Sequence, residues 1–79
     1  MSDTSERMGR MITVLRAENR MQRKALAEQT GLSYAFLCDI ESGKRGMSAA
    51  TLRTIADVFG IWPSELMRRA ECLPVLVTS

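Results

Sequence analysis

The stretch "LAEQTGLSYAFLCDIESGKR", from Leu26 to Arg45, decides the fold, because two helix ends follow one another closely within it. Gly31 is expected to end one helix, since glycine adopts the left-handed cap conformation without strain. Ser33 can cap the next helix, which Gly43 ends in the same way. The sequence therefore predicts a helix-turn-helix with only "GLS" between its helices. The apolar residues expected to face inward from this pair are Leu26, Ala27, Leu37 and Ile40.

Apolar spacing predicts three more helices around this pair. Ser5 is expected to cap a first helix that ends near Asn19. Ser48 can open a fourth helix that runs to Gly60, and Pro63 suits the first turn of a fifth. The side chains expected to face inward from these helices are Met8, Met11, Ile12, Leu15, Leu52, Ile55, Ala56, Phe59, Leu66 and Met67. Only the final "LPVLVTS" could alternate as a strand, so the predicted fold class is all-α, a compact five-helix bundle.

Length and composition agree with one small globular domain. The chain has 79 residues, of which 46% are apolar and 25% are charged. We expect a flexible N-terminus at residues 1–4, a folded domain at residues 5–71 and a tail at residues 72–79 that could serve in dimerisation. No apolar run approaches the roughly 18 residues that span a bilayer, and the first residues do not resemble a secretory signal. A cytoplasmic location without a membrane partner is expected.

Residue types that carry catalysis or bind metals are scarce. Histidine is absent, and Cys38 and Cys72 are too isolated for a metal-binding pair or a disulfide framework. The sequence therefore predicts no catalytic residues, no metal, no cofactor and no enzymatic activity, while a redox role for Cys38 stays a minor alternative. The 11 Lys and Arg residues exceed the 9 Asp and Glu residues by only two, which indicates an anionic partner weakly.

The residues "LAEQTGLSYAFLCDIESGKR", followed by "LRTIADVFGIWPSEL", resemble the helix-turn-helix family of Cro and the phage repressors, often called the XRE family. The likeness runs without a gap from about Met8 to Met67. It implies a lambda-repressor-like DNA-binding domain. It also implies that the third helix is a recognition helix, whose first turn enters the DNA major groove.

The resemblance implies that Tyr34, Ala35 and Asp39 contact DNA bases. Ala35 can lie against a thymine methyl group, and Tyr34 can combine a ring contact with one hydrogen bond. Asp39 could accept a hydrogen bond from a cytosine amino group, but an ion pair with Lys44 or Arg45 is an equally good interpretation.

Phosphate contacts are expected from polar and basic residues that flank the recognition helix. The alternative is that these charges only form a solvated face. Phe36, within that helix, is expected to pack partly on the second helix and to touch DNA only secondarily. The residues expected to contact phosphates are Gln22, Arg23, Lys24, Ser33, Lys44 and Arg45.

Arg16 and Glu41 occupy positions that form an ion pair between helices in this family, and we expect this pair to fix the tilt of the third helix. The chain also departs from the family pattern. Arg20 replaces the usual glycine before the second helix, Met47 replaces a common proline, and Gln22 is a poor cap. These departures affect single contacts and leave the expected fold intact.

The function expected from these residues is sequence-specific DNA binding by a transcriptional regulator. A homodimeric repressor or controller protein on a palindromic operator is favoured, because one recognition helix reads too few base pairs to select a site. The alternative is a protein-interaction module, such as an antitoxin, whose DNA binding is secondary. A partner protein, either a toxin or RNA polymerase, stays unidentified.

The dimer surface is expected at the C-terminal end of the chain. The tail is apolar and follows a helix within a bundle too small to bury it. The alternatives are that the tail folds back on its own core or frays. The residues expected in the dimer interface are Trp62, Leu73, Val75, Leu76 and Val77.

Overall fold

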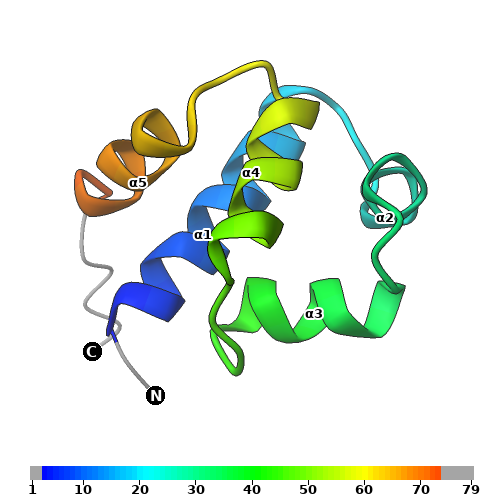
Figure 1. The fold of residues 1–79 in the computed structure, drawn as a ribbon, viewed down its shortest axis with the longest axis horizontal. Helices are drawn as coiled ribbons and strands as arrows, with labels where there is room; N and C mark the ends of the chain where they lie inside the picture. Colours follow the sequence, from blue (N-terminus) through cyan, green and yellow to red (C-terminus); the bar gives the residue numbers. More distant parts are fainter. Residues whose placement is uncertain (1–2, 74–79) are drawn as a thin grey trace.

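Five helices account for the fold in the computed structural model, which describes residues 3–73. They are α1 (Asp3–Glu18), α2 (Arg23–Thr30), α3 (Tyr34–Ser42), α4 (Ala49–Val58) and α5 (Pro63–Glu71), and no strand occurs within this range. Helix α1 packs on α3 and on α5, while α2 packs on α3 and α4, and α4 also packs on α5 (Figure 1). The all-α prediction is confirmed. In the same range, no helix has the length and apolar character needed to cross a membrane.

One continuous core joins all five helices, and most of the predicted inward-facing residues form it. Its largest fully buried side chains are Ile12, Leu26, Leu37, Ile40, Ile55 and Leu66. The prediction that Met67 faces inward is wrong, because 44% of its surface is exposed. Helix α5 buries Leu66 and Ala70, which lie four residues apart, so Met67 is rotated about 100° away from the buried stripe.

Local signals in the sequence fix most of the helix ends. Gly31 and Gly43 have φ angles of 76° and 85°, so both predicted left-handed caps are confirmed. The hydroxyl oxygen of Ser33 accepts a hydrogen bond from the backbone N–H of Phe36 at 3.0 Å. Ser48 caps α4 in the same way. The turn between α2 and α3 is therefore set by the residues predicted to set it.

The predicted start of the first helix is wrong. Helix α1 begins at Asp3, so Ser5 lies inside it and is not its cap, and part of the expected N-terminal segment is helical. The run "SDTS" at residues 2–5 contains only residue types that favour helix N-termini, so sequence pattern cannot choose among them.

Arg20, which stands where a glycine is usual in the family that the sequence resembles, adopts a backbone conformation that favours glycine. Its φ angle is 53°, in the left-handed region that glycine occupies without a steric penalty. The chain turns here between α1 and α2, and the backbone N–H of Met21 donates to the carbonyl of Arg16 at 2.8 Å. The turn is thus formed with an arginine in a conformation that glycine adopts more readily.

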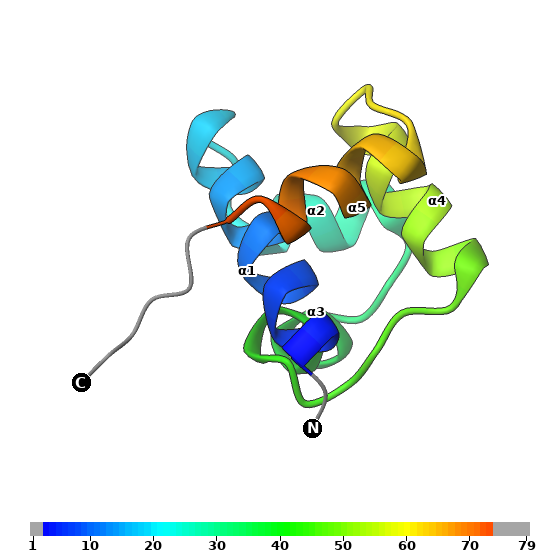
Figure 2. The ribbon, with the colours of Figure 1, turned by 90° about the vertical axis from the view of Figure 1, so that its left-hand side faces the viewer.

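Helices α1 and α3 approach each other closely at Gly9, which the sequence analysis did not single out. A Cβ atom at Gly9 would lie 2.7 Å from the carbonyl oxygen of Glu41 and closer still to that of Ile40. In two views the C-terminal part of α3 lies beside the N-terminal half of α1 (Figures 1 and 2). Only a residue without a side chain allows this separation of the backbones.

The predicted ion pair between Arg16 and Glu41 is confirmed and is bidentate. Arg16 donates from Nε to Oε2 of Glu41 at 2.9 Å and from Nη2 to Oε1 at 2.7 Å. Thr13 donates its hydroxyl to Oε1 at 2.9 Å, and only 2% of the Glu41 side chain is exposed. Burial would raise the pKa of Glu41, but hydrogen bonds from Arg16, Arg23 and Thr13 outweigh it and lower the pKa below its ordinary value.

Gly9→Ala tests the close approach of α1 and α3. Alanine favours a helix interior over glycine by about 1 kcal/mol, so helix propensity alone would stabilise the variant. We expect the opposite, a loss of about 1–3 kcal/mol in the free energy of unfolding, because the new methyl group must push two backbones apart. Urea denaturation gives the sign of the change in the free energy of unfolding. A stabilised variant would show that α1 and α3 are farther apart at Gly9 than in this structure.

Glu41→Gln tests the ion pair and its dependence on pH. We expect the free energy of unfolding to fall by about 3 kcal/mol at pH 7, because Arg16 loses its charged partner in a buried site. A carboxyl whose pKa is lower in the folded state stabilises the fold above its unfolded pKa, about 4.3, and this contribution is lost as the pH falls through the folded value. The difference in the free energy of unfolding between parent and variant should therefore be constant above pH 5 and shrink in more acidic solution.

The matched control is Glu28→Gln, which removes a carboxylate from an exposed position on α2. It should change stability by less than about 0.5 kcal/mol at any of these pH values. A difference in the free energy of unfolding between parent and Glu41→Gln that stays the same from pH 7 to pH 3 would contradict the lowered pKa of Glu41.

Candidate nucleic-acid interface

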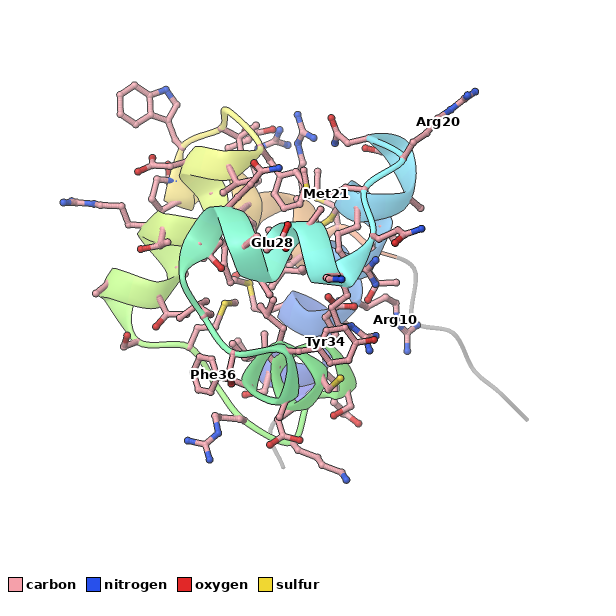
Figure 3. All side chains as sticks on the ribbon, turned by 90° about the vertical axis from the view of Figure 1, so that its right-hand side faces the viewer. Arg10, Arg20, Met21, Glu28, Tyr34 and Phe36 are labelled. Atoms are coloured by element: carbon pink, nitrogen blue, oxygen red, sulfur yellow. The ribbon has the colours of Figure 1, made fainter. Side chains whose placement is uncertain are left out.

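Helix α3 presents its first turn to solvent while its opposite face is buried. Tyr34 is 53% exposed and Ala35 is also exposed, whereas Leu37 and Ile40 are at most 1% exposed. Figure 3 views α3 along its axis and shows Tyr34 and Phe36 on opposite sides of it, below α2. The helix-turn-helix therefore leaves a protruding helix end whose outward side chains can reach another molecule.

Asp39 follows Ala35 by one turn and is half-buried. Its backbone carbonyl accepts from the N–H groups of Lys44 and Arg45 at 2.9 and 3.3 Å, which ties the next loop to the end of α3. Among residues 3–73, the ion pairs do not include one from the Asp39 carboxylate to either cation. The expected alternative, an ion pair between Asp39 and Lys44 or Arg45, is thus not formed among these residues.

Phe36 is half-buried and packs against the core. Its ring lies 5.3 Å from the guanidinium carbon of Arg45, a distance typical of a cation–π contact. Arg45 is exposed, so the contact holds its charged head beside α3 without removing it from solvent.

The residues expected to contact phosphates lie at both ends of the α2–α3 unit and, for Ser33, in the turn between its helices. Lys24 is exposed at the start of α2, and Lys44 is exposed just after α3. Gln22 is the N-cap residue of α2 but makes no capping hydrogen bond, so its expected weakness as a cap is confirmed. The Ser33 hydroxyl is already used as an acceptor within α3. The exposed cations thus flank Tyr34 and Ala35 on the same unit.

Arg23 differs from these cations, because its guanidinium is directed toward α3. It donates to the sulfur of Cys38 at 3.0 Å and to Oε1 of Glu41 at 3.2 Å, and it lies 5.5 Å from the centre of the Tyr34 ring. The hydrogen bond to Glu41 is the largest cause that raises the pKa of Arg23, and burial opposes it. This arrangement was not expected from the sequence, although Tyr34, Cys38 and Glu41 share one helical face at i, i+4 and i+7.

The expected dimer residues fall in different environments. Trp62 precedes α5 and is 78% exposed, the most exposed large apolar side chain among the described residues. Leu73 is half-buried against the core of its own chain. Val75, Leu76 and Val77 lie outside the described residues. Trp62 stands at the start of α5, and Met67, five residues later, is also exposed.

Comparison with known proteins identifies the fold and its relatives. The crystal structure of the clp gene regulator ClgR from C. glutamicum is similar, with a TM-score of 0.82 and 21% identity over 90% of this chain and 92% of that chain. The restriction-modification controller protein C.AhdI from Aeromonas hydrophila matches with a TM-score of 0.75 and 26% identity, covering 78% of this chain and 94% of that chain.

Sequence comparison agrees. The immunity repressor protein of Bacillus phage phi105 is 33% identical over 60 residues, which are 76% of this chain but 42% of that protein. The chain thus spans less than half the length of this relative. Residues 11–71 match the Cro/C1-type HTH DNA-binding domain, which confirms the resemblance read from the helix-turn-helix. The chain belongs to the family of Cro/C1-type helix-turn-helix DNA-binding domains.

Proposed function

We propose that this chain is a sequence-specific transcriptional regulator, a repressor or controller that binds a palindromic operator as a homodimer. The observation that carries the proposal is the exposed first turn of α3, with Tyr34 and Ala35 outward and the inner face fixed by Glu41. The similarity to an immunity repressor and to a controller protein supports this role. The family comprises DNA-binding regulators and is not a class of enzymes.

Base recognition is proposed for Tyr34, Ala35 and Asp39. The small side chain of Ala35 lets α3 approach the floor of the major groove and can contact a thymine methyl group. Tyr34 adds a ring and one hydroxyl, and the Asp39 carboxylate can accept from a cytosine amino group. Recognition would then depend on shape and apolar contact more than on forked hydrogen bonds.

Phosphate contacts are proposed for Lys24, Lys44 and Arg45, which are exposed on both sides of the recognition turn. Gln22 and Ser33 stand at the starts of α2 and α3, where backbone N–H groups and the helix dipole favour a phosphate. Arg23 has weaker support for such a contact, because its guanidinium is already paired with Glu41.

Dimerisation is proposed through α5 and the residues around it. One recognition helix covers a half-site, and two-fold dimers place their helices about 34 Å apart. The exposed indole of Trp62 is the kind of aromatic anchor that protein interfaces favour. Leu73, Val75, Leu76 and Val77 are proposed to take part in the same interface, although Leu73 also packs on its own core.

Ala35→Glu and Arg45→Gln should affect DNA binding in different ways. A duplex selected from a random pool and an unrelated duplex are titrated across a range of salt concentrations. We expect Ala35→Glu to abolish the preference for the selected duplex, a cost of about 1–3 kcal/mol per lost base contact. Arg45→Gln should weaken binding to both duplexes and lower the magnitude of the salt slope by about one.

Arg53→Gln is the control for the loss of one positive charge, because Arg53 is exposed on α4 and belongs neither to the proposed DNA contacts nor to the proposed dimer surface. It should leave the salt slope unchanged. If Ala35→Glu retains the parent's preference, α3 does not read the bases. If the parent binds DNA only together with a co-purified protein, the antitoxin-like alternative is favoured instead.

Trp62→Ser and deletion of residues 72–79 test the dimer surface. Sedimentation equilibrium at micromolar concentration should show a dimer for the parent and a shift toward monomer for each variant, because each removes apolar interface area. Operator binding should weaken in parallel. A parent that is monomeric while bound to one half-site would contradict the homodimer, and two variants that stay dimeric would place the interface elsewhere.

A further inference from the structure

The side chain of Arg23 bridges the start of α2 and one face of α3. Its guanidinium meets a carboxylate, a sulfur atom and an aromatic ring that are stacked along that face, from Glu41 through Cys38 to Tyr34. The ring belongs to the first residue of α3, which is also the most exposed of the three. Arg23 therefore links the buried end of this face to the end that protrudes.

The guanidinium is held from its buried side. Glu41 is 2% exposed at its side chain and is fixed by Arg16 at 2.7 Å, so the acceptor of Arg23 cannot move freely. The Nε atom of Arg23 is buried, and within residues 3–73 it has no hydrogen-bond partner. A fully solvated arginine would satisfy every donor. The observed orientation is therefore maintained by the contacts with Glu41, Cys38 and the ring, at the expense of one hydrogen bond.

These contacts restrict Tyr34. A tyrosine that is 53% exposed on the first turn of a helix would otherwise exchange among rotamers. A guanidinium carbon 5.5 Å from the ring centre favours the rotamer in which the ring lies beside the cation. We propose that Arg23 is a positioning residue that holds the Tyr34 ring ready for base contact, so that it sets sequence preference and does not clamp a phosphate. The inference rests on the proposed function.

The two roles of Arg23 differ in their salt dependence. A phosphate clamp releases counterions, so its loss lowers the salt slope on every duplex. A positioning residue directs its guanidinium to Glu41 and contacts no phosphate, so its loss leaves the salt slope unchanged and weakens binding only to the duplex that Tyr34 reads. Ordering Tyr34 before binding spares part of the entropy that complex formation would otherwise lose.

Arg23→Lys separates the roles most sharply, because it keeps the positive charge but lacks the planar fork. We expect it to weaken binding to the selected duplex by roughly twofold to tenfold, while affinity for an unrelated duplex and the salt slope stay as in the parent. Arg23→Gln should give the same pattern. If Arg23 clamps a phosphate, the lysine variant would bind like the parent, and the glutamine variant would lower the slope by about one on both duplexes.

A double-mutant cycle with Tyr34→Leu tests the coupling. Once the ring is absent, Arg23→Lys should cause no further loss of affinity for the selected duplex. Lys24→Gln is the matched control, because it removes the neighbouring exposed cation of α2 and should act equally with and without the ring. Full additivity of Arg23→Lys and Tyr34→Leu would overturn the inference.

The ring contact can also be measured without DNA. The chain has a single tyrosine, so its ring resonances in an NMR spectrum are unambiguous. The side-chain protons of Arg23 should be shifted upfield in the parent and return to ordinary values in Tyr34→Leu. Absence of this shift overturns the inference about Arg23 and leaves the proposed function standing. A parent that selects no duplex overturns the proposed function, and with it the role of Arg23 on DNA.

Discussion

The buried carboxylate of Glu41 is the constraint on which the arrangement of the helices depends. A charge with 2% side-chain exposure must receive several strong hydrogen bonds, and here they come from Arg16 and Thr13 of α1 and from Arg23 of α2. Any movement of α3 relative to these two helices would leave the carboxylate unsatisfied. The interaction therefore favours one orientation of the helix-turn-helix.

Gly9 adds a second constraint on the position of α3 relative to α1. The absence of a side chain sets how near α1 and α3 can come, and the forked Arg16–Glu41 pair sets how α3 is rotated about that contact. The close approach at Gly9 and the bidentate pair both join α1 to α3. Leu37 and Ile40 fill the core beside this contact, so the outward direction of Tyr34 and Ala35 follows from what is fixed on the inner face.

The sequence predicted the features that have local causes. These features are Gly31 at positive φ, Ser33 as a helix cap and most of the core, whose apolar residues stand at helical spacing. The sequence could not predict the start of α1, because four capping types stand in a row. Nor could it predict the direction of Arg23, since a long side chain at a helix start can reach solvent or a neighbouring helix equally well, and tertiary contacts decide.

The net charge of +2 hides a division among the basic residues. Arg16 and Arg23 are directed toward a carboxylate inside the bundle, while Lys24, Lys44 and Arg45 are exposed at its surface. The first group fixes geometry, and the second leaves positive potential around the protruding turn of α3, where an anionic polymer would meet it. Because interaction with phosphates depends on exposed local charge, a chain that is nearly neutral overall can still present exposed cations near the side chains of Tyr34 and Ala35.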